Sequence, residues 1–133
     1  MKKLIFILLS FVLAVTANAQ ENKNTFIPQP ESVVMKQGNF TLTNTTKIFL
    51  PKKFQKELNP YLVAKFEEDT GLILKTESKH PRINSNYIQF QITKEASVKS
   101  EGYILDISDV KIIIKAKDYA GFFNGFQTLR QAM

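Results

Sequence analysis

Few residues of this chain combine a reactive side chain with the neighbours that catalysis would need. His80 is the only histidine, and it lies in the polar stretch "KHPR" without a Cys, an Asp or a second His at ligand spacing. A single histidine also cannot supply both the base and the orienting group that activate a Ser or Thr hydroxyl. We therefore interpret His80 as a solvated loop residue.

Two other groups could suggest chemistry. Glu67, Glu68 and Asp69 are consecutive, and consecutive helical residues point in different directions, so we interpret them as a solvated acidic helix end. Gly121 and Gly125 lack the spacing, the Lys and the Ser/Thr of a phosphate-binding loop. The sequence thus predicts no catalytic, no cofactor-binding and no metal-binding residue, and no cofactor.

The first 19 residues, "MKKLIFILLSFVLAVTANA", have the features of a secretory signal peptide. Lys2 and Lys3 precede a short apolar run, and Ala17 and Ala19 form an A-x-A cleavage pattern. A retained membrane anchor is the alternative, but the run is short for a span of about 20 residues. We predict cleavage after Ala19, a secreted or periplasmic protein, and no membrane contact afterwards.

Removal of 19 residues from 133 leaves 114, enough for one domain. The formal net charge is +6, and Lys2 and Lys3 carry two of those charges, which leaves a scattered +4. Nucleic-acid binding is not predicted, because a basic stripe with interleaved aromatic residues is not visible. The chain contains no cysteine, so the fold must rely on its core. Residues 20–26 are polar and predict a disordered linker, which leaves 27–133 as the domain.

The spacing of apolar residues predicts a strand, a helix and a second strand in the first half of the domain. Gly38 marks a turn, after which residues 40–43 and then residues 47–51 read as an edge or entry strand pair. Apolar residues then recur at helical spacing from Phe54 until Gly71, a C-terminal cap. Pro60 favours either one helix with an irregular first half or a helix start at Asn59, and we prefer the former. The stretch "LILKT" predicts the next strand of a crossover unit.

Three alternating stretches in the second half predict strands with one buried face. In "YIQFQIT", "GYILDIS" and "VKIIIKAK", apolar residues alternate with polar ones. Ser108 and Asp109 are expected to form a tight hairpin turn between the last two. The pattern predicts an antiparallel meander with one wet face, and overall an α+β fold with a mixed, mainly antiparallel sheet and two helices on one face.

The last helix has two faces that could pack. Asp118 is its expected N-cap, and one apolar stripe comprises Tyr119, Phe122, Phe123, Phe126, Leu129 and Met133. A second face carries the small residues Gly121, Gly125, Thr128 and Ala132. Glycine inside a helix costs roughly 1 kcal/mol relative to alanine, so we expect a neighbour on that face. Either the first helix or a domain after Met133 would provide it, and we favour the latter: the chain is expected to be the front end of a larger protein.

Two segments together resemble a known family. "FIPQPESVVMKQGNFTL" resembles the opening of the N-terminal domain of family 20 glycoside hydrolases, the β-N-acetylhexosaminidases, with its I-P-x-P and G-x-F-x-L phrases. "EGYILDISDVKIIIKAKDYAGFFNGFQTLRQAM" is similar to the end of that domain, which has E-x-Y-x-L, I-x-I-x-A and A-G-x-F-x-G-x-Q-T-L-x-Q phrases. Between them, "EDTGL" fits the order of elements. The resemblance covers residues 26–133.

The resemblance implies a non-catalytic domain that precedes a (β/α)8 barrel absent from these 133 residues. In the family, a barrel Asp and Glu perform a retaining reaction in which the acetamido oxygen of the substrate attacks the anomeric carbon. No catalytic residue can be carried over to this chain. The implied partner is the barrel, reached through the last helix, and a glycan substrate would bind only to the full-length protein. The alternatives are a free-standing secreted glycan-binding or adhesion module, and a degenerate, inactive fragment.

Overall fold

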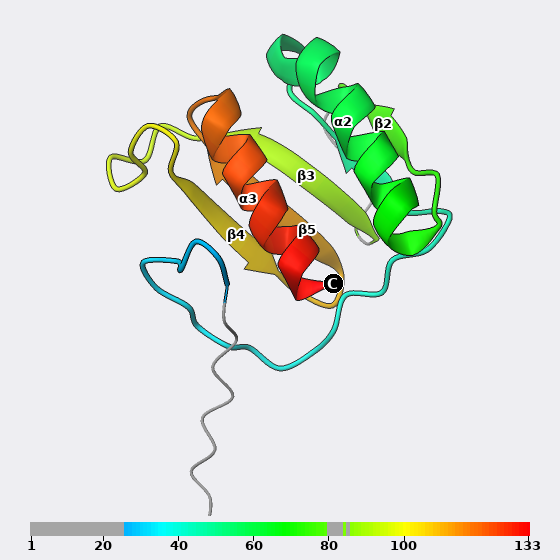
Figure 1. Cartoon of the computed structure of the whole chain (residues 1–133), viewed down its shortest axis with the longest axis horizontal. Coiled ribbons are helices and arrows are strands. Elements are labelled where there is room, and N and C mark those ends of the chain that lie inside the picture. Colours follow the sequence, from blue (N-terminus) through cyan, green and yellow to red (C-terminus); the bar gives the residue numbers. More distant parts are fainter. Residues whose placement is uncertain (1–25, 80–83, 85) are drawn as a thin grey trace, which may run out of the picture.

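The computed structural model describes residues 26–79, 84 and 86–133. The predicted signal peptide, residues 20–25 of the predicted linker and His80 lie outside the described residues. The expected α+β fold with a mixed sheet and two helices on one face is confirmed (Figure 1). The elements are β1 (Lys47–Phe49), α2 (Lys52–Thr70), β2 (Lys75–Glu77), β3 (Tyr87–Ile92), β4 (Tyr103–Ile107), β5 (Lys111–Ala116) and α3 (Tyr119–Ala132).

The sheet has the order β2-β1-β3-β5-β4, and its pairings differ from the predicted meander. The pairs β1/β2, β1/β3 and β3/β5 are parallel, and only β4/β5 is antiparallel among the described strands. The expectation of a mainly antiparallel sheet is therefore wrong. The connection from β3 passes to the edge strand β4, and the hairpin then returns β5 beside β3. The alternation of apolar and polar residues along a strand indicates only that one face of the sheet is covered. It does not distinguish parallel from antiparallel pairing.

The predicted crossover unit is confirmed, because β1, α2 and β2 follow one another and the two strands are parallel. Two details of the prediction are wrong. Residues 40–42 form no strand, although Phe40 and Leu42 pack against the core, and β1 lies inside the sheet instead of at its edge. The strand expected at residues 72–76 begins only at Lys75.

Helix α2 runs through Pro60 without a break in its assignment, so a single helix is observed and Asn59 is not its N-cap. Asn59 instead accepts a hydrogen bond from the Thr76 hydroxyl at 2.5 Å, which ties α2 to β2. Gly71 ends the helix as predicted. Its φ of 71° is left-handed, and its N–H donates to the Glu67 carbonyl at 2.8 Å.

The β4–β5 hairpin is confirmed, with its turn one residue later than expected. Ser108 N–H donates to the Lys111 carbonyl at 3.0 Å, so Asp109 and Val110 form the corner. Val110 is consequently 39% exposed and does not share the buried face of Ile112 and Ile114. Ile92 was also expected on a buried face, but it ends β3 and is 47% exposed.

The core lies between the sheet and the two helices, which run side by side in Figure 1. Aromatic rings fill the space between the helices: Phe54 and Phe122 have centroids 5.4 Å apart, and Phe66 and Phe126 are 5.2 Å apart. The Phe90 ring of β3 contacts the rings of both Phe122 and Phe126 from the sheet. Because aromatic rings bury large areas, this layer accounts for much of the hydrophobic stabilisation.

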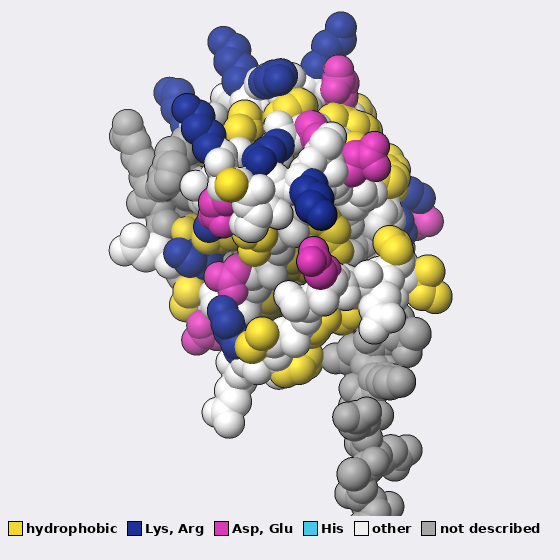
Figure 2. All heavy atoms as spheres, turned by 90° about the vertical axis from the view of Figure 1, so that its left-hand side faces the viewer, with side chains coloured by type: hydrophobic (Ala, Val, Ile, Leu, Met, Phe, Trp, Pro, Cys, Tyr) yellow, Lys and Arg dark blue, Asp and Glu magenta, His cyan; other side chains and the backbone are white. Residues whose placement is uncertain are grey.

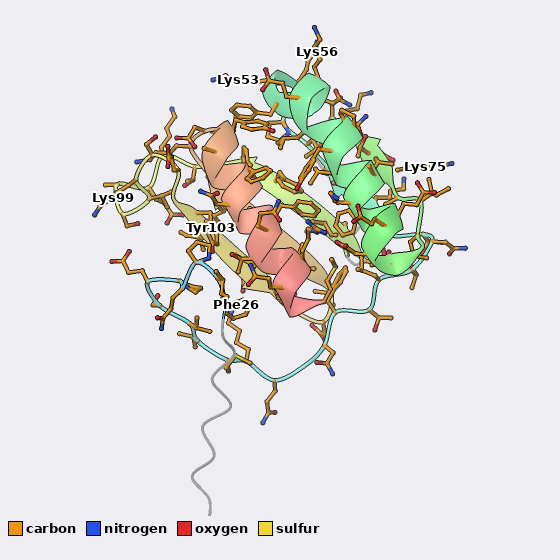
Figure 3. All side chains as sticks on the ribbon, viewed as in Figure 1. Phe26, Lys53, Lys56, Lys75, Lys99 and Tyr103 are labelled. Carbon is orange, nitrogen blue, oxygen red and sulfur yellow. The ribbon has the colours of Figure 1, made fainter. Side chains whose placement is uncertain are left out.

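Charged side chains of both signs lie on the described surface around this core (Figure 2). On the face shown in Figure 2, many Lys and Arg side chains lie in the upper part of the view, and Asp and Glu side chains lie among and below them. Lys53, Lys56, Lys75 and Lys99 project outward in different directions in Figure 3. Neither helix among the described residues combines the length and hydropathy that a bilayer span requires.

Candidate docking surface on the helix pair

The acidic run at the end of α2 is divided between separate partners. Glu68 bonds Lys65 one turn earlier at 2.5 Å, whereas Asp69 receives two hydrogen bonds from the Arg130 guanidinium of α3, at 2.5 and 2.8 Å. Glu68 and Asp69 are therefore held by different partners, a Lys on α2 itself and an Arg on α3. Within the described residues, no group of three or more His, Cys, Asp or Glu is placed to hold a metal ion.

Helix α3 begins at the predicted cap. The Asp118 carboxylate accepts the Gly121 N–H at 2.8 Å, and it also accepts the Ser100 hydroxyl at 2.8 Å and the Glu101 N–H at 3.1 Å. The Gly121 bond, followed by those from Ser100 and Glu101, holds the pKa of Asp118 below its usual value. The carboxylate thereby joins the β3–β4 connection to the start of α3.

The small-residue face of α3 packs inside this chain, which corrects the expectation that a following domain occupies it. A Cβ on Gly121 would lie 2.4 Å from the Gly102 carbonyl oxygen, and a Cβ on Gly125 would lie 2.6 Å from the Ile114 methyl group. Thr128 is buried and its hydroxyl bonds the Tyr103 hydroxyl at 2.5 Å, while Ala132 is exposed. The glycines allow α3 to approach β4 and β5 closely, so their presence is no evidence of a missing neighbour.

A different surface of α3 remains open, and we call it the helix seam: Tyr61, Tyr119, Phe123, Gln127 and Arg130. The Tyr119 and Phe123 rings stack with centroids 6.4 Å apart, and Phe123 lies 5.3 Å from the Tyr61 ring. The Gln127 amide donates to the Tyr61 hydroxyl at 2.6 Å. Tyr119 is 37% exposed, and the other four are half-buried. The seam thus presents fixed aromatic surface along the line where the helices meet.

The end of the seam at Arg130 is polar. The hydrogen bonds from Arg130 hold the pKa of Asp69 below its usual value, and those to Asp69 raise the pKa of Arg130. Ile73 and Met133, each just after the end of a helix, are 66% and 48% exposed. Aromatic residues and Arg are enriched in the cores of protein–protein interfaces, so the seam is a candidate contact surface.

The N-terminal segment is attached to the last turn of α3. The Ile27 N–H donates to the Gln131 side-chain oxygen at 2.8 Å, and the Gln131 amide donates back to the Ile27 carbonyl at 2.8 Å. Lys36 of the same segment bonds Asp106 of β4 at 2.7 Å. These contacts fix the path of a segment that has no regular secondary structure between residues 26 and 43.

The sequence predicted that the small-residue face of α3 meets a further domain, and the structure shows that Gly121 and Gly125 on this face pack against this chain itself. The exposed aromatic side of α3 was not predicted as a candidate contact surface. The pattern contained a usable signal: Tyr119 and Phe123 lie one turn apart at the edge of the apolar stripe, where a helix face meets solvent. Tyr61, on α2, could be added only after the two helices were placed side by side.

Comparison with known proteins places this fold in a family. A family model described as glycosyl hydrolase family 20, domain 2, matches residues 23–133. The structure of the family 20 β-N-acetylhexosaminidase from Streptomyces coelicolor A3(2) is 28% identical with a TM-score of 0.67, and the match covers 77% of this chain and 20% of that chain. A mutant β-hexosaminidase of Streptomyces plicatus, in complex with the product GlcNAc, gives the same values.

This chain therefore spans about a fifth of the length of those two enzymes. A search of curated proteins found no match. The family match covers most of the chain, and the fold is similar to part of the two solved structures. The chain belongs to the family 20 glycosyl hydrolases and corresponds to their domain 2.

Proposed function

We propose that this chain is the non-catalytic front domain of a secreted or periplasmic β-N-acetylhexosaminidase, which removes terminal N-acetylhexosamine residues from glycans. The match to domain 2 of family 20 over residues 23–133 carries this proposal. In the parent protein, the reaction would be the retaining, substrate-assisted hydrolysis of the family, performed by a barrel domain. The role of this domain would be to support the barrel.

The helix seam is the surface that we propose for contact with that barrel. Tyr119 and Phe123 offer half-exposed rings that Tyr61 and Gln127 hold in place. Rigid aromatic side chains lose little conformational freedom when they are covered, so they suit a permanent interdomain contact. This assignment keeps the barrel on α3, as expected from the sequence, but on a different face.

Two measurements test the proposed activity. The longer protein expressed from the same reading frame is expected to hydrolyse a chromogenic N-acetyl-β-glucosaminide, whereas residues 20–133 alone are expected to give no turnover above a buffer blank. A stop codon after Met133, or turnover by the fragment, would contradict the proposal. Secretion is tested separately by N-terminal sequencing of the exported protein, which should begin at Gln20.

The seam is tested by comparing one substitution in two contexts. Tyr119→Ser removes a ring that is 37% exposed in this chain, so we expect little change in the Tm of the isolated domain. In the longer protein the same change would leave an interface cavity, and the Tm should fall clearly further. Lys56→Ser, at an exposed position of α2 outside the seam, is the matched control and should change neither. Equal effects of Tyr119→Ser in both contexts would exclude the seam as the contact.

A further inference from the structure

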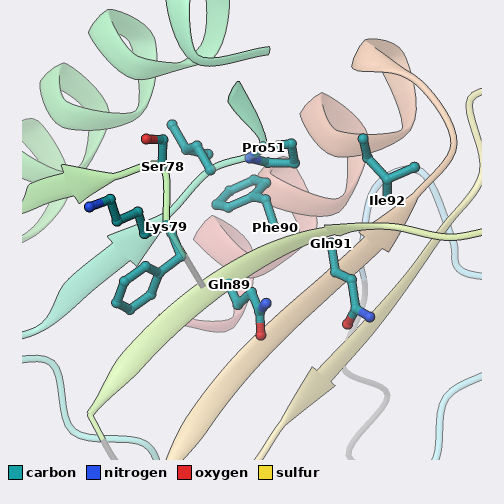
Figure 4. A pocket seen from close by; sticks show the side chains of 9 residues that line it. Pro51, Ser78, Lys79, Gln89, Phe90, Gln91 and Ile92 are labelled. Atoms are coloured by element: carbon teal, nitrogen blue, oxygen red, sulfur yellow. The ribbon is translucent and has the colours of Figure 1, made fainter. Parts of the chain in front are cut away.

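A small cavity opens where the parallel strands end. It has a volume of about 210 Å³, and we call it the carboxyl-end notch (Figure 4). Residues from the carboxyl ends of three adjacent parallel strands line it: Leu50 and Pro51 after β1, Ser78 and Lys79 after β2, and Gln91 and Ile92 of β3. The notch is separate from the helix seam and shares no residue with it.

The sequence explains why a notch forms here. Pro51 lies two residues after the end of β1, and its nitrogen carries no hydrogen to continue the ladder. The described pairing of β1 with β3 therefore stops at Phe49 and Gln89, while β3 continues to Ile92. Over these last residues, the side of β3 that faces β1 borders the notch instead of another strand.

The position of the notch matches a general rule for parallel sheets. From its carboxyl end, β1 leads into α2, whereas β3 leads away to β4 at the opposite edge of the sheet (Figure 1). Ligands bind preferentially outside the carboxyl ends of parallel strands at the point where neighbouring connections diverge. Here the cavity and the divergence of the connections coincide, although they are independent features of the fold.

The lining indicates which ligand would fit. Gln89 and Gln91 project from the same side of β3 in Figure 4, and each amide offers a donor and an acceptor. The described hydrogen bonds leave both amides without a protein partner. Ser78 adds a hydroxyl, while Phe49 and Ile92 contribute apolar walls. A small ring with hydroxyl groups at its edge and C–H groups on its faces matches this mixture of donors, acceptors and apolar surface.

The charged side chains around the notch indicate which kind of ring would bind best. Lys79 is exposed at the rim of the notch, and none of the described lining residues is acidic. The described ion pairs do not include Lys79, so its ammonium is available to a carboxylate. An exposed pair of this kind typically gives about a threefold preference in binding.

We propose that the carboxyl-end notch binds one pyranose ring of a glycan and prefers a ring that carries a carboxylate. The choice of a sugar among polar rings rests on the proposed function, because a glycan-processing protein meets such rings continually. The notch is small and open, so affinity for a single ring should be millimolar. Weak binding of this kind can still matter, since a tethered second site raises the effective concentration of a polymeric ligand.

The test is a titration of the ¹⁵N-labelled chain with methyl β-D-glucuronide and, in parallel, with methyl β-D-glucoside. We expect saturable chemical-shift changes confined to Ser78, Lys79 and residues 89–92, including the two glutamine side-chain amides. The glucuronide should bind about threefold more tightly at low ionic strength. The difference should disappear in about 1 M salt, where the screening length is near 3 Å.

Matched variants separate specific binding from general effects. Gln91→Ala should weaken both glycosides, whereas Gln37→Ala, at an exposed glutamine of the N-terminal segment, should change neither. Lys79→Gln should remove only the preference for the glucuronide, and Lys56→Gln is its control. Unchanged spectra outside the notch would show that each variant is folded.

Several outcomes would overturn the proposal. These are the absence of saturable shifts with both glycosides, shifts centred on the helix seam, or binding that Gln91→Ala leaves intact. If an acetylated tripeptide amide shifts the same resonances and the glycosides do not, the notch accepts a peptide and the sugar assignment fails. The titration does not depend on hydrolysis, so an inactive parent protein would contradict the proposed function and leave this result standing.

Discussion

Helix α3 approaches β4 and β5 through glycines, whereas it contacts α2 through large rings that also touch Phe90 of β3. On the sheet side, Gly121 and Gly125 bring its backbone against Gly102, Tyr103 and Ile114. On the α2 side, Phe122 and Phe126 fill a wide gap together with Phe54 and Phe66. One helix can thus lie close to two strands through its glycines and farther from a second helix through its phenylalanines. Small residues on a helix therefore need not indicate an absent partner.

The largest expected effect comes from removing a ring on the α2 side. Phe126 is fully buried and contacts the rings of Phe66, Phe90 and Tyr61. Phe126→Ala should lower the free energy of unfolding by about 3–5 kcal/mol, measured by urea denaturation, because a large cavity would remain. Phe123→Ala, on the half-exposed side of the same helix, should cost clearly less. Equal losses would mean that the aromatic layer is not the main support of α3.

The close side of α3 should respond to an added methyl group. Gly121→Ala would place its Cβ against the Gly102 carbonyl oxygen, a backbone atom, and should cost about 1–3 kcal/mol despite the better helix propensity of alanine. A Cβ at Gly125 meets side-chain atoms first, Cγ2 of Ile114 at 2.6 Å, and these shift more easily than a backbone carbonyl, so the loss should be smaller. Urea denaturation of both variants ranks them. A stabilised Gly121→Ala would contradict the close approach described here.

A smaller effect is expected at the start of α3, and it depends on pH. Asp118→Ala should cost about 1 kcal/mol at pH 7, because the N-cap is lost. The pKa of Asp118 is lowered in the folded state, chiefly by the Gly121 N–H, so the carboxylate stabilises the fold above its usual pKa of 3.8. That contribution is lost as the pH falls through the folded-state pKa. The difference in Tm between wild type and variant should therefore shrink as the pH is lowered below about 4. A difference in Tm that stays constant with pH would argue against the cap.

The smallest effect is expected where the two helices are joined by charge. Arg130→Lys keeps the positive charge near Asp69 but cannot form the two parallel hydrogen bonds of the guanidinium. We expect a slight decrease in Tm that shrinks at high salt, because the pair is partly exposed. A decrease in Tm as large as that of Phe126→Ala would contradict the expectation that aromatic packing stabilises the helix pair more than this ion pair does.

Local signals predicted the elements well. The Gly71 cap, the Asp118 cap and the helical spacing of Phe122, Phe126 and Leu129 depend on residues close in sequence, and the structure confirms each of them. The β4–β5 hairpin was predictable for the same reason, within one residue at its turn.

Long-range relations were not predictable from these patterns. The parallel pairing of β3 with β5 depends on the path of the 93–102 connection, and alternating residues carry no record of that path. The rings of Phe49 and Tyr87 meet edge to face at 5.8 Å, and their burial requires β1 and β3 to be neighbours. The paired residues of these two strands, such as Lys47 and Tyr87, are 40 positions apart in the sequence. The small-residue face was recognised, but a helical pattern alone cannot say which neighbour it meets. The helix seam and the carboxyl-end notch depend on the same long-range arrangement.

The reciprocal hydrogen bonds between Ile27 and Gln131 determine how the domain would carry mechanical load. Tension applied between the N-terminal segment and the last turn of α3 would act first on these two bonds, and the strands between them would feel no strain until both had broken. The Gln131 side chain thus joins the N-terminal segment to the C-terminal helix. A force applied to either of these two segments would move the other with it.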